Sequence, residues 1–187
     1  NLFTNGIGDN VTGAYLNDSE LSMIQDGFSE IRYLHARPID INTASPWILN
    51  DNTSISTTGH PLSIHTDITA SSGNNAGLNL STNAILTVNG DIDLSPGNRA
   101  SGITFENSSS LLLDGNLLTS GGDITISDSV QATSVLSDAI ISADSGTISV
   151  GNNGANLHAN NVELRASEIN FSGAVTGTGD LQIRAET

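Results

Sequence analysis

Residues 121–126 read Gly121-Gly122-Asp123-Ile124-Thr125-Ile126: a small polar turn, then an apolar-x-apolar pair. In such a pair, alternate side chains point to one face of a strand. The pair recurs along the chain at Leu78/Leu80, Ile103/Phe105, Ile124/Ile126, Ile148/Val150 and Ile169/Phe171. The first members of successive pairs are 25, 21, 24 and 21 residues apart. A repeat of this length, built from strand-forming residues without an intervening helix, indicates a solenoid of stacked β-coils.

A second apolar series runs between these pairs, at Ile92/Leu94, Leu117, Ile140, Val162/Leu164 and Leu181/Ile183. Parallel β-crossovers are right-handed in nearly all proteins. We therefore predict an all-β fold, a right-handed parallel β-helix, with coils of about 19–24 residues over 59–187. The competing two-sheet β-roll usually carries Gly-Gly-x-Gly-x-Asp nonapeptides, of which this chain holds only fragments.

Residues 1–58 are expected to form an N-terminal lead-in and cap region. Within it, an amphipathic helix is predicted over about 18–30, because Leu21, Ile24, Phe28 and Ile31 are spaced by three, four and three residues. Gly27 interrupts this stripe and limits the length of the helix. A β-helix has open ends with unpaired strand edges, so we expect the stripe to cover one of them. The sequence begins at Asn1 without a signal-like segment, which suggests that it is an excerpt from a longer precursor.

The composition restricts the classes of partner. The net charge is −15, with five arginines and no lysine. Nucleic-acid binding requires a cationic face, which this chain lacks, and anionic membrane surfaces should repel it. The chain has no cysteine, which excludes disulfides and thiolate metal sites, and no apolar run long enough for membrane insertion.

The acidic residues beside the predicted strands are the candidate ligands and acids. Asp91, Asp93, Asp114 and Asp123 could line up on one face, where they could bind calcium through hard oxygen ligands or line a hydrolase groove. Asp91 and Asp93 alternate with Ile92 and Leu94, so both should point outward if the apolar residues point inward. A solvated acidic face is the simpler interpretation, so we propose no catalytic residues and require no cofactor. Arg165 and Arg184 could lie on neighbouring coils as surface residues.

The aromatic and histidine residues give only weak indications of a binding site. Trp47, the only tryptophan, could stack on sugar rings together with Tyr33, or could close the core where a regular coil ends. The second interpretation is favoured. His60 and His65 are five residues apart, which places them on opposite faces of a strand and argues against zinc.

Two phrases near the N-terminus resemble a known family. They are Leu16-Asn17-Asp18-Ser19-Glu20-Leu21 and Ile24-Gln25-Asp26-Gly27-Phe28-Ser29-Glu30-Ile31, followed by repeats such as 121–126. Together they are similar to segments of filamentous-haemagglutinin-like adhesins, very large surface proteins of cyanobacteria and proteobacteria. The resemblance implies a right-handed parallel β-helix, export to the cell surface and a role in adhesion or surface structure. The N-terminal secretion domain usual in such proteins is not visible here.

We therefore expect an extracellular structural or adhesive β-solenoid that is not an enzyme. Its expected partners are further copies of itself, stacked head to tail, or a cell-surface or glycan receptor. The alternative is a carbohydrate-active or carbohydrate-binding β-helix that uses its acidic face. A third interpretation, an ice- or mineral-contacting solenoid, would need regular Thr-x-Thr ladders, which are absent.

Overall fold

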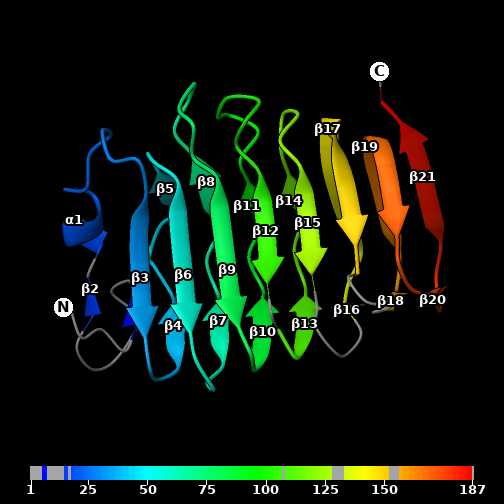
Figure 1. Cartoon of the computed structure of the whole chain (residues 1–187), viewed down its shortest axis with the longest axis horizontal. Coiled ribbons are helices and arrows are strands. Elements are labelled where there is room, and N and C mark those ends of the chain that lie inside the picture. Colours follow the sequence, from blue (N-terminus) through cyan, green and yellow to red (C-terminus); the bar gives the residue numbers. More distant parts are fainter. Residues whose placement is uncertain are drawn as a thin grey trace.

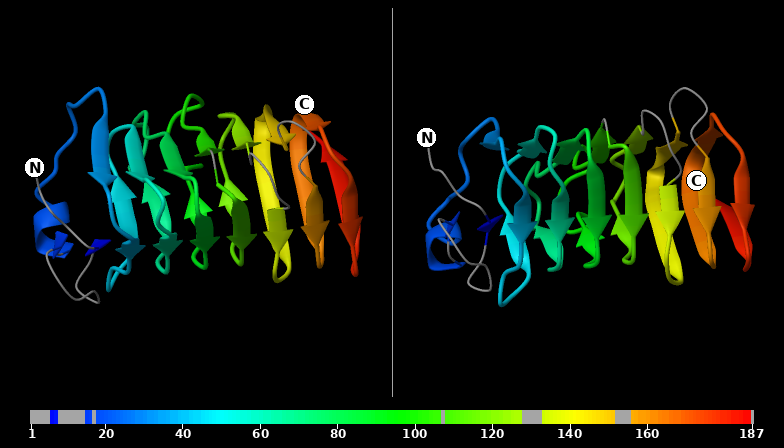
Figure 2. Two further views of the ribbon diagram at one scale, coloured as in Figure 1. Left: turned by 60° about the horizontal axis from the view of Figure 1, so that its bottom comes forward. Right: turned by 90° about the horizontal axis from the view of Figure 1, so that it is seen from below.

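The computed structural model describes residues 6–7, 15–16, 18–106, 108–127, 133–151 and 156–186. The chain winds into an all-β parallel solenoid of about six turns. Successive turns stack side by side from the N-terminal to the C-terminal end, forming a rod (Figures 1 and 2). The predicted parallel β-helix is confirmed.

Each regular turn contributes three strands, which stack in three rows. Row 1 runs in the order β2 (Tyr15–Leu16), β1 (Gly6–Ile7), β4 (Ile39–Ile41), β7 (Leu62–Ile64), β10 (Ile85–Val88), β13 (Ser110–Leu113), β16 (Thr133–Val135), β18 (Leu157–Ala159) and β20 (Val175–Gly177). Row 2 consists of β5 (Trp47–Leu49), β8 (Ile68–Ala70), β11 (Ile92–Asp93), β14 (Leu117–Leu118), the first parts of β17 (Ala139–Val150) and β19 (Val162–Phe171), and β21 (Leu181–Ala185). Row 3 consists of β3 (Ile31–His35), β6 (Thr53–Thr57), β9 (Leu78–Thr82), β12 (Ile103–Glu106), β15 (Ile124–Ser127) and the second parts of β17 and β19.

The register of row 3 matches the sequence repeat. Leu78 pairs with Ile103, Ile103 with Ile124, Ile124 with Ile148, and Ile148 with Ile169. These are the first members of the apolar pairs, so the spacings of 25, 21, 24 and 21 residues are the lengths of successive turns. In row 2 the partner of Leu117 is Ile141, not the expected Ile140. Ile141 is fully buried, whereas Ile140 faces outward.

The core is a narrow column of aliphatic side chains. Buried and less buried residues alternate along the strands, as in Thr53–Thr57 and Leu78–Thr82. Phe105 is the largest fully buried side chain and lies in register between Leu80 and Ile126. Each turn therefore packs mainly on the turns before and after it.

Two boundaries differ from those predicted. The solenoid begins before residue 59, because β3, β4, β5 and β6 already pair in parallel with strands of the next turn. The helix α1 covers only Asp18–Leu21, not 18–30. After it the chain follows the end of the solenoid, where tertiary hydrogen bonds replace helical ones: Asn50 Nδ2 donates to the Ile24 carbonyl over 2.9 Å, and Gly27 N donates to Asp51 Oδ1 over 3.2 Å. Gly27 adopts φ of 130°, which ends any helical path.

Candidate functional site

A polar ladder follows the corner that precedes row 2. Asp67 Oδ1 accepts the backbone N–H of Asp91 over 2.9 Å, and Asp91 Oδ1 accepts the N–H of Asn116 over 2.8 Å. The side-chain amide of Asn116 also donates to Asp91 Oδ1, and Asn116 Oδ1 accepts the N–H of Ile140. We call Asp67, Asp91 and Asn116 the corner ladder. Each member binds the backbone of the next turn where the strand hydrogen bonds are interrupted.

The four candidate acids of the sequence do not share one groove. Asp91 and Asp114 lie at the corner before row 2, on neighbouring turns, and Asp93 lies within β11. Asp123 lies at the corner before row 3, where its Oδ1 accepts the N–H of Thr147 over 2.8 Å. Asp93 Oδ1 accepts the N–H of Ser95 over 2.9 Å in a local turn. Three of these four carboxylates thus bind backbone N–H groups, which is a structural use of their charge.

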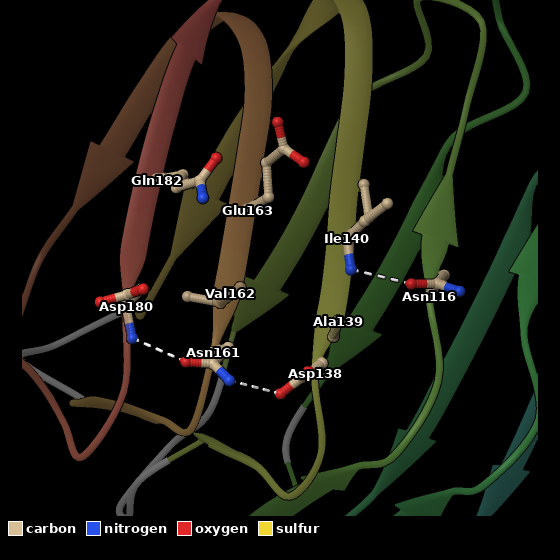
Figure 3. A pocket seen from close by; sticks show the side chains of 9 residues that line it. All are labelled: Asn116, Asp138, Ala139, Ile140, Asn161, Val162, Glu163, Asp180 and Gln182. Atoms are coloured by element: carbon tan, nitrogen blue, oxygen red, sulfur yellow. Dashed lines mark hydrogen bonds between the residues drawn. The ribbon is translucent and has the colours of Figure 1, made fainter.

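The same corner continues as a shallow hollow near the C-terminal end (Figure 3). Asn161 connects three turns there: its Nδ2 donates to Asp138 Oδ1 over 2.6 Å, and its Oδ1 accepts the N–H of Asp180 over 2.8 Å. Ile140, Glu163 and Gln182 also line the hollow. The hydrogen bonds of Asn161 thus continue, at this end, the pattern of the corner ladder.

Arg165 and Arg184 meet across neighbouring turns, because they are paired residues of β19 and β21. Both form ion pairs with Glu163: Arg165 Nη2 lies 2.7 Å from Glu163 Oε2, and Arg184 Nε contacts Oε1. The hydrogen bond from Arg165 lowers the pKa of Glu163, the charge of Arg184 acts in the same direction, and partial burial opposes them. This cluster holds β21 to β19 on the outer face.

His60 and His65 flank β7 at corners, whereas His35 ends β3 and His158 lies within β18. His65 Nε2 lies 3.2 Å from Asp40 Oδ1, and its Nδ1 receives a hydrogen bond from Asn89 Nδ2 over 3.0 Å. The His60 carbonyl accepts a hydrogen bond from Thr82 Oγ1. Within the part of the chain that the structure describes, no group of three or more His, Asp or Glu side chains is placed to hold a metal ion.

The N-terminal end is partly covered by the residues predicted as a cap. Leu21 is buried and Ile24 packs against the core, while Phe28 is 61% exposed and Ile31 begins β3. Trp47 is buried in β5, and its ring meets that of Tyr33 edge-to-face at 5.7 Å between centroids. Burial raises the pKa of Tyr33 to about 12. Asp18 Oδ2 fastens α1 to the first turn by accepting the N–H of Ala44 over 2.9 Å.

At the other end, no described strand follows β21 in the stack. Leu181 and Ile183 of β21 pair with the buried Val162 and Leu164, so they occupy inward-facing positions. They are nevertheless 45% and 57% exposed. Among the described strands, β21 pairs only with β19. This end therefore presents apolar side chains next to the free backbone edge of a strand.

Several of these residues could not be singled out from sequence. Asn116, Asn161 and Glu163 look like ordinary surface residues, and only the register between turns reveals their partners. Of the helices in the described ranges, none is long and apolar enough to cross a membrane. Comparison with protein-family models, with curated proteins and with solved structures finds no match for this chain.

Proposed function

We propose that this chain is a structural, non-catalytic segment or subunit of an extracellular bacterial surface fibre or adhesin. Its solenoid would act as a stiff acidic rod that stacks head to tail on further copies of itself. The proposal rests on the continuous parallel ladder of strands and on the family resemblance of residues 16–31. It places the protein outside the cell, without nucleic-acid or membrane-inserted partners.

The exposed C-terminal end is the observation that carries the stacking proposal. Stacking a turn on β21 would bury Leu181 and Ile183 and pair the free edge of the strand. At the opposite end, β3 pairs only with β6 among the described strands, so its other edge has no strand partner there, and the segment 18–30 covers this end only in part. Two different ends that join without closure generate a filament.

Electron microscopy of the purified chain at several concentrations, with calcium and with chelator, tests this proposal. Rods of constant width that lengthen with concentration support it, and lengthening that requires calcium adds the ion to the assembly. Short particles of one length in every condition contradict self-assembly and direct attention to glycan receptors, which a glycan array would screen.

A matched pair of variants locates the contact. Ile183→Asp places a charge in the proposed interface, and Ile85→Asp places one on β10 in the middle of the rod, where the side chain is 46% exposed against 57% for Ile183. We expect rods from the Ile85 variant and short particles from the Ile183 variant. Equal assembly by both variants would exclude the β21 end as the contact. Circular dichroism confirms that each variant is folded.

We propose no second function. A carbohydrate-active groove would need Asp91, Asp93, Asp114 and Asp123 together, whereas Asp123 lies at another corner than Asp91 and Asp114, and Asp93 lies within β11.

A further inference from the structure

Asp51 is an acidic residue at an interior position of the solenoid. It lies between β5 and β6, where Leu49, Asp51 and Thr53 are buried and the intervening residues are less so. Thr53 pairs with Leu78, and Leu78 with Ile103, so the corresponding residues of the next two turns are Ala76 and Ser101. Both of these are small and fully buried. The first turn thus carries a carboxylate where its neighbours carry a methyl or a hydroxyl group.

The charge of this carboxylate is incompletely compensated. Asp51 is 4% exposed, and its Oδ1 accepts one hydrogen bond, from Gly27 N over 3.2 Å. Its Oδ2 is shielded from solvent and has no hydrogen-bond partner in the described part of the chain. Burying a carboxylate without a counter-charge is costly, so such groups are normally paired or bound to a metal ion.

The surroundings of Asp51 supply oxygen atoms and no cation. Asp51 and Asp26 line one hollow between the N-terminal segment and the corners of the first two turns. The hydrogen bond from Gly27 holds Asp26, the preceding residue, beside Asp51. Asn52, Asn74 and Asn75 line the same hollow, and none of its lining residues is Arg or His. Carboxylates, amide oxygens and backbone carbonyls are the ligands that calcium prefers.

We propose that Asp51 and Asp26 form a calcium site that fastens the N-terminal segment 18–30 to the first turn of the solenoid. The ion compensates the buried charge of Asp51 and joins it to Asp26, which is exposed on the cap segment. This site is separate from Asp91, Asp93, Asp114 and Asp123, and it does not depend on end-to-end assembly. With two carboxylates, its affinity should fall in the range of extracellular calcium modules, a Kd of about 10⁻⁴–10⁻³ M.

Calcium titration of the chelator-treated full chain by calorimetry tests the site. We expect one saturable site in the wild type, with affinity lowered about tenfold or more in Asp51→Asn and in Asp26→Asn. Asp114→Asn is the control, because it removes one exposed negative charge from another corner and should change affinity less than about twofold. Terbium gives a second readout, since Trp47, four residues before Asp51, can sensitise its emission.

The unfolding temperature distinguishes binding at Asp51 from general screening of surface charge, because only binding at Asp51 should reverse the order of the wild type and Asp51→Asn. In chelator, Asp51→Asn should unfold at a higher temperature than the wild type, because the uncompensated charge is gone. In saturating calcium, the order should reverse. Calcium binding of equal affinity in the wild type and Asp51→Asn overturns the site. A response that Asp114→Asn weakens as much as Asp51→Asn also overturns it, because this would be general screening of an acidic surface.

Discussion

The burial of Tyr33 should make the stability of the protein depend on pH in the alkaline range. Its pKa is raised to about 12 from the ordinary 10.0 because burial against Trp47 disfavours the phenolate. Below pH 10, the tyrosine is protonated in both the folded and the unfolded state. Between pH 10 and 12 the unfolded state alone loses the proton, so the free energy of unfolding should fall by about 1–2 kcal/mol, allowing for partial exposure of the ring.

The chain has no lysine and no cysteine, so Tyr15 is the only other side chain expected to titrate between pH 10 and 12. Urea unfolding followed by circular dichroism at several pH values between 9 and 12 measures the effect. Tyr33→Phe keeps the ring and removes the ionisable group, so its stability should vary less across this range. Parallel curves for the two proteins would show that the burial of Tyr33 is not responsible.

At the scale of single strands, the prediction from sequence was accurate where alternation was unambiguous. The pairs of row 3 each have two apolar residues separated by a polar or small one, and their register was confirmed. Row 1 does not stand out in the sequence as a separate series, because strands such as Thr133–Val135 and Leu157–Ala159 carry small or polar residues at inward positions. Ile140 and Ile141 are adjacent and both apolar, so only pairing with Leu117 shows which one enters the core.

The attachment of β21 also depends on contacts between turns, and Glu163 provides its ionic part. The lowered pKa of Glu163 means that its contribution is present above the ordinary value of 4.5 and is lost as the pH falls through the lowered value. Glu163→Gln should therefore increase amide hydrogen exchange over 181–185 at pH 7 by about two- to fivefold. The difference should disappear in acid, after correction for intrinsic exchange rates.

Glu168→Gln is the control for this experiment, since Glu168 lies on the same strand and accepts a hydrogen bond from Asn170 over 3.1 Å. It should leave exchange over 181–185 unchanged. If both variants accelerate exchange equally, the loss of negative charge on β19, and not the arginine contacts, controls the attachment of β21.

At the scale of the whole molecule, the repeat predicted the rod but not the details of its ends. Regular turns follow from a pattern that every turn obeys, whereas the N-terminal end depends on single tertiary contacts. Phe28 illustrates the difference: its spacing from Leu21 and Ile24 suggests a helical stripe, yet hydrogen bonds to Asn50 and Asp51 lead the chain away from a helix. The contacts of the candidate site residues could not be predicted from the sequence for a similar reason: the partners of Asp91 and Asp123 are backbone groups one turn away.

Two phenylalanines allow a direct test of how the rod distributes its stability. Phe105 is fully buried between Leu80 and Ile126, and Phe28 is 61% exposed. Phe105→Ala should lower the free energy of unfolding by about 3–5 kcal/mol, since it leaves a cavity between turns. The same substitution at Phe28 should change it by less than about 0.5 kcal/mol.

The shape of the unfolding transition adds information that these values do not contain. In a solenoid each turn is stabilised by its neighbours, so weakening a central interface can separate the rod into two cooperative units. Phe105→Ala should therefore broaden or divide the urea transition, and hydrogen exchange should show different opening free energies on the two sides of β12. A single sharp transition at lower urea would instead show that the turns unfold as one unit, with long-range coupling stronger than the contacts between adjacent turns supply. A large loss of stability in Phe28→Ala would mean that the N-terminal segment, and not the stacked core, limits the stability of the rod.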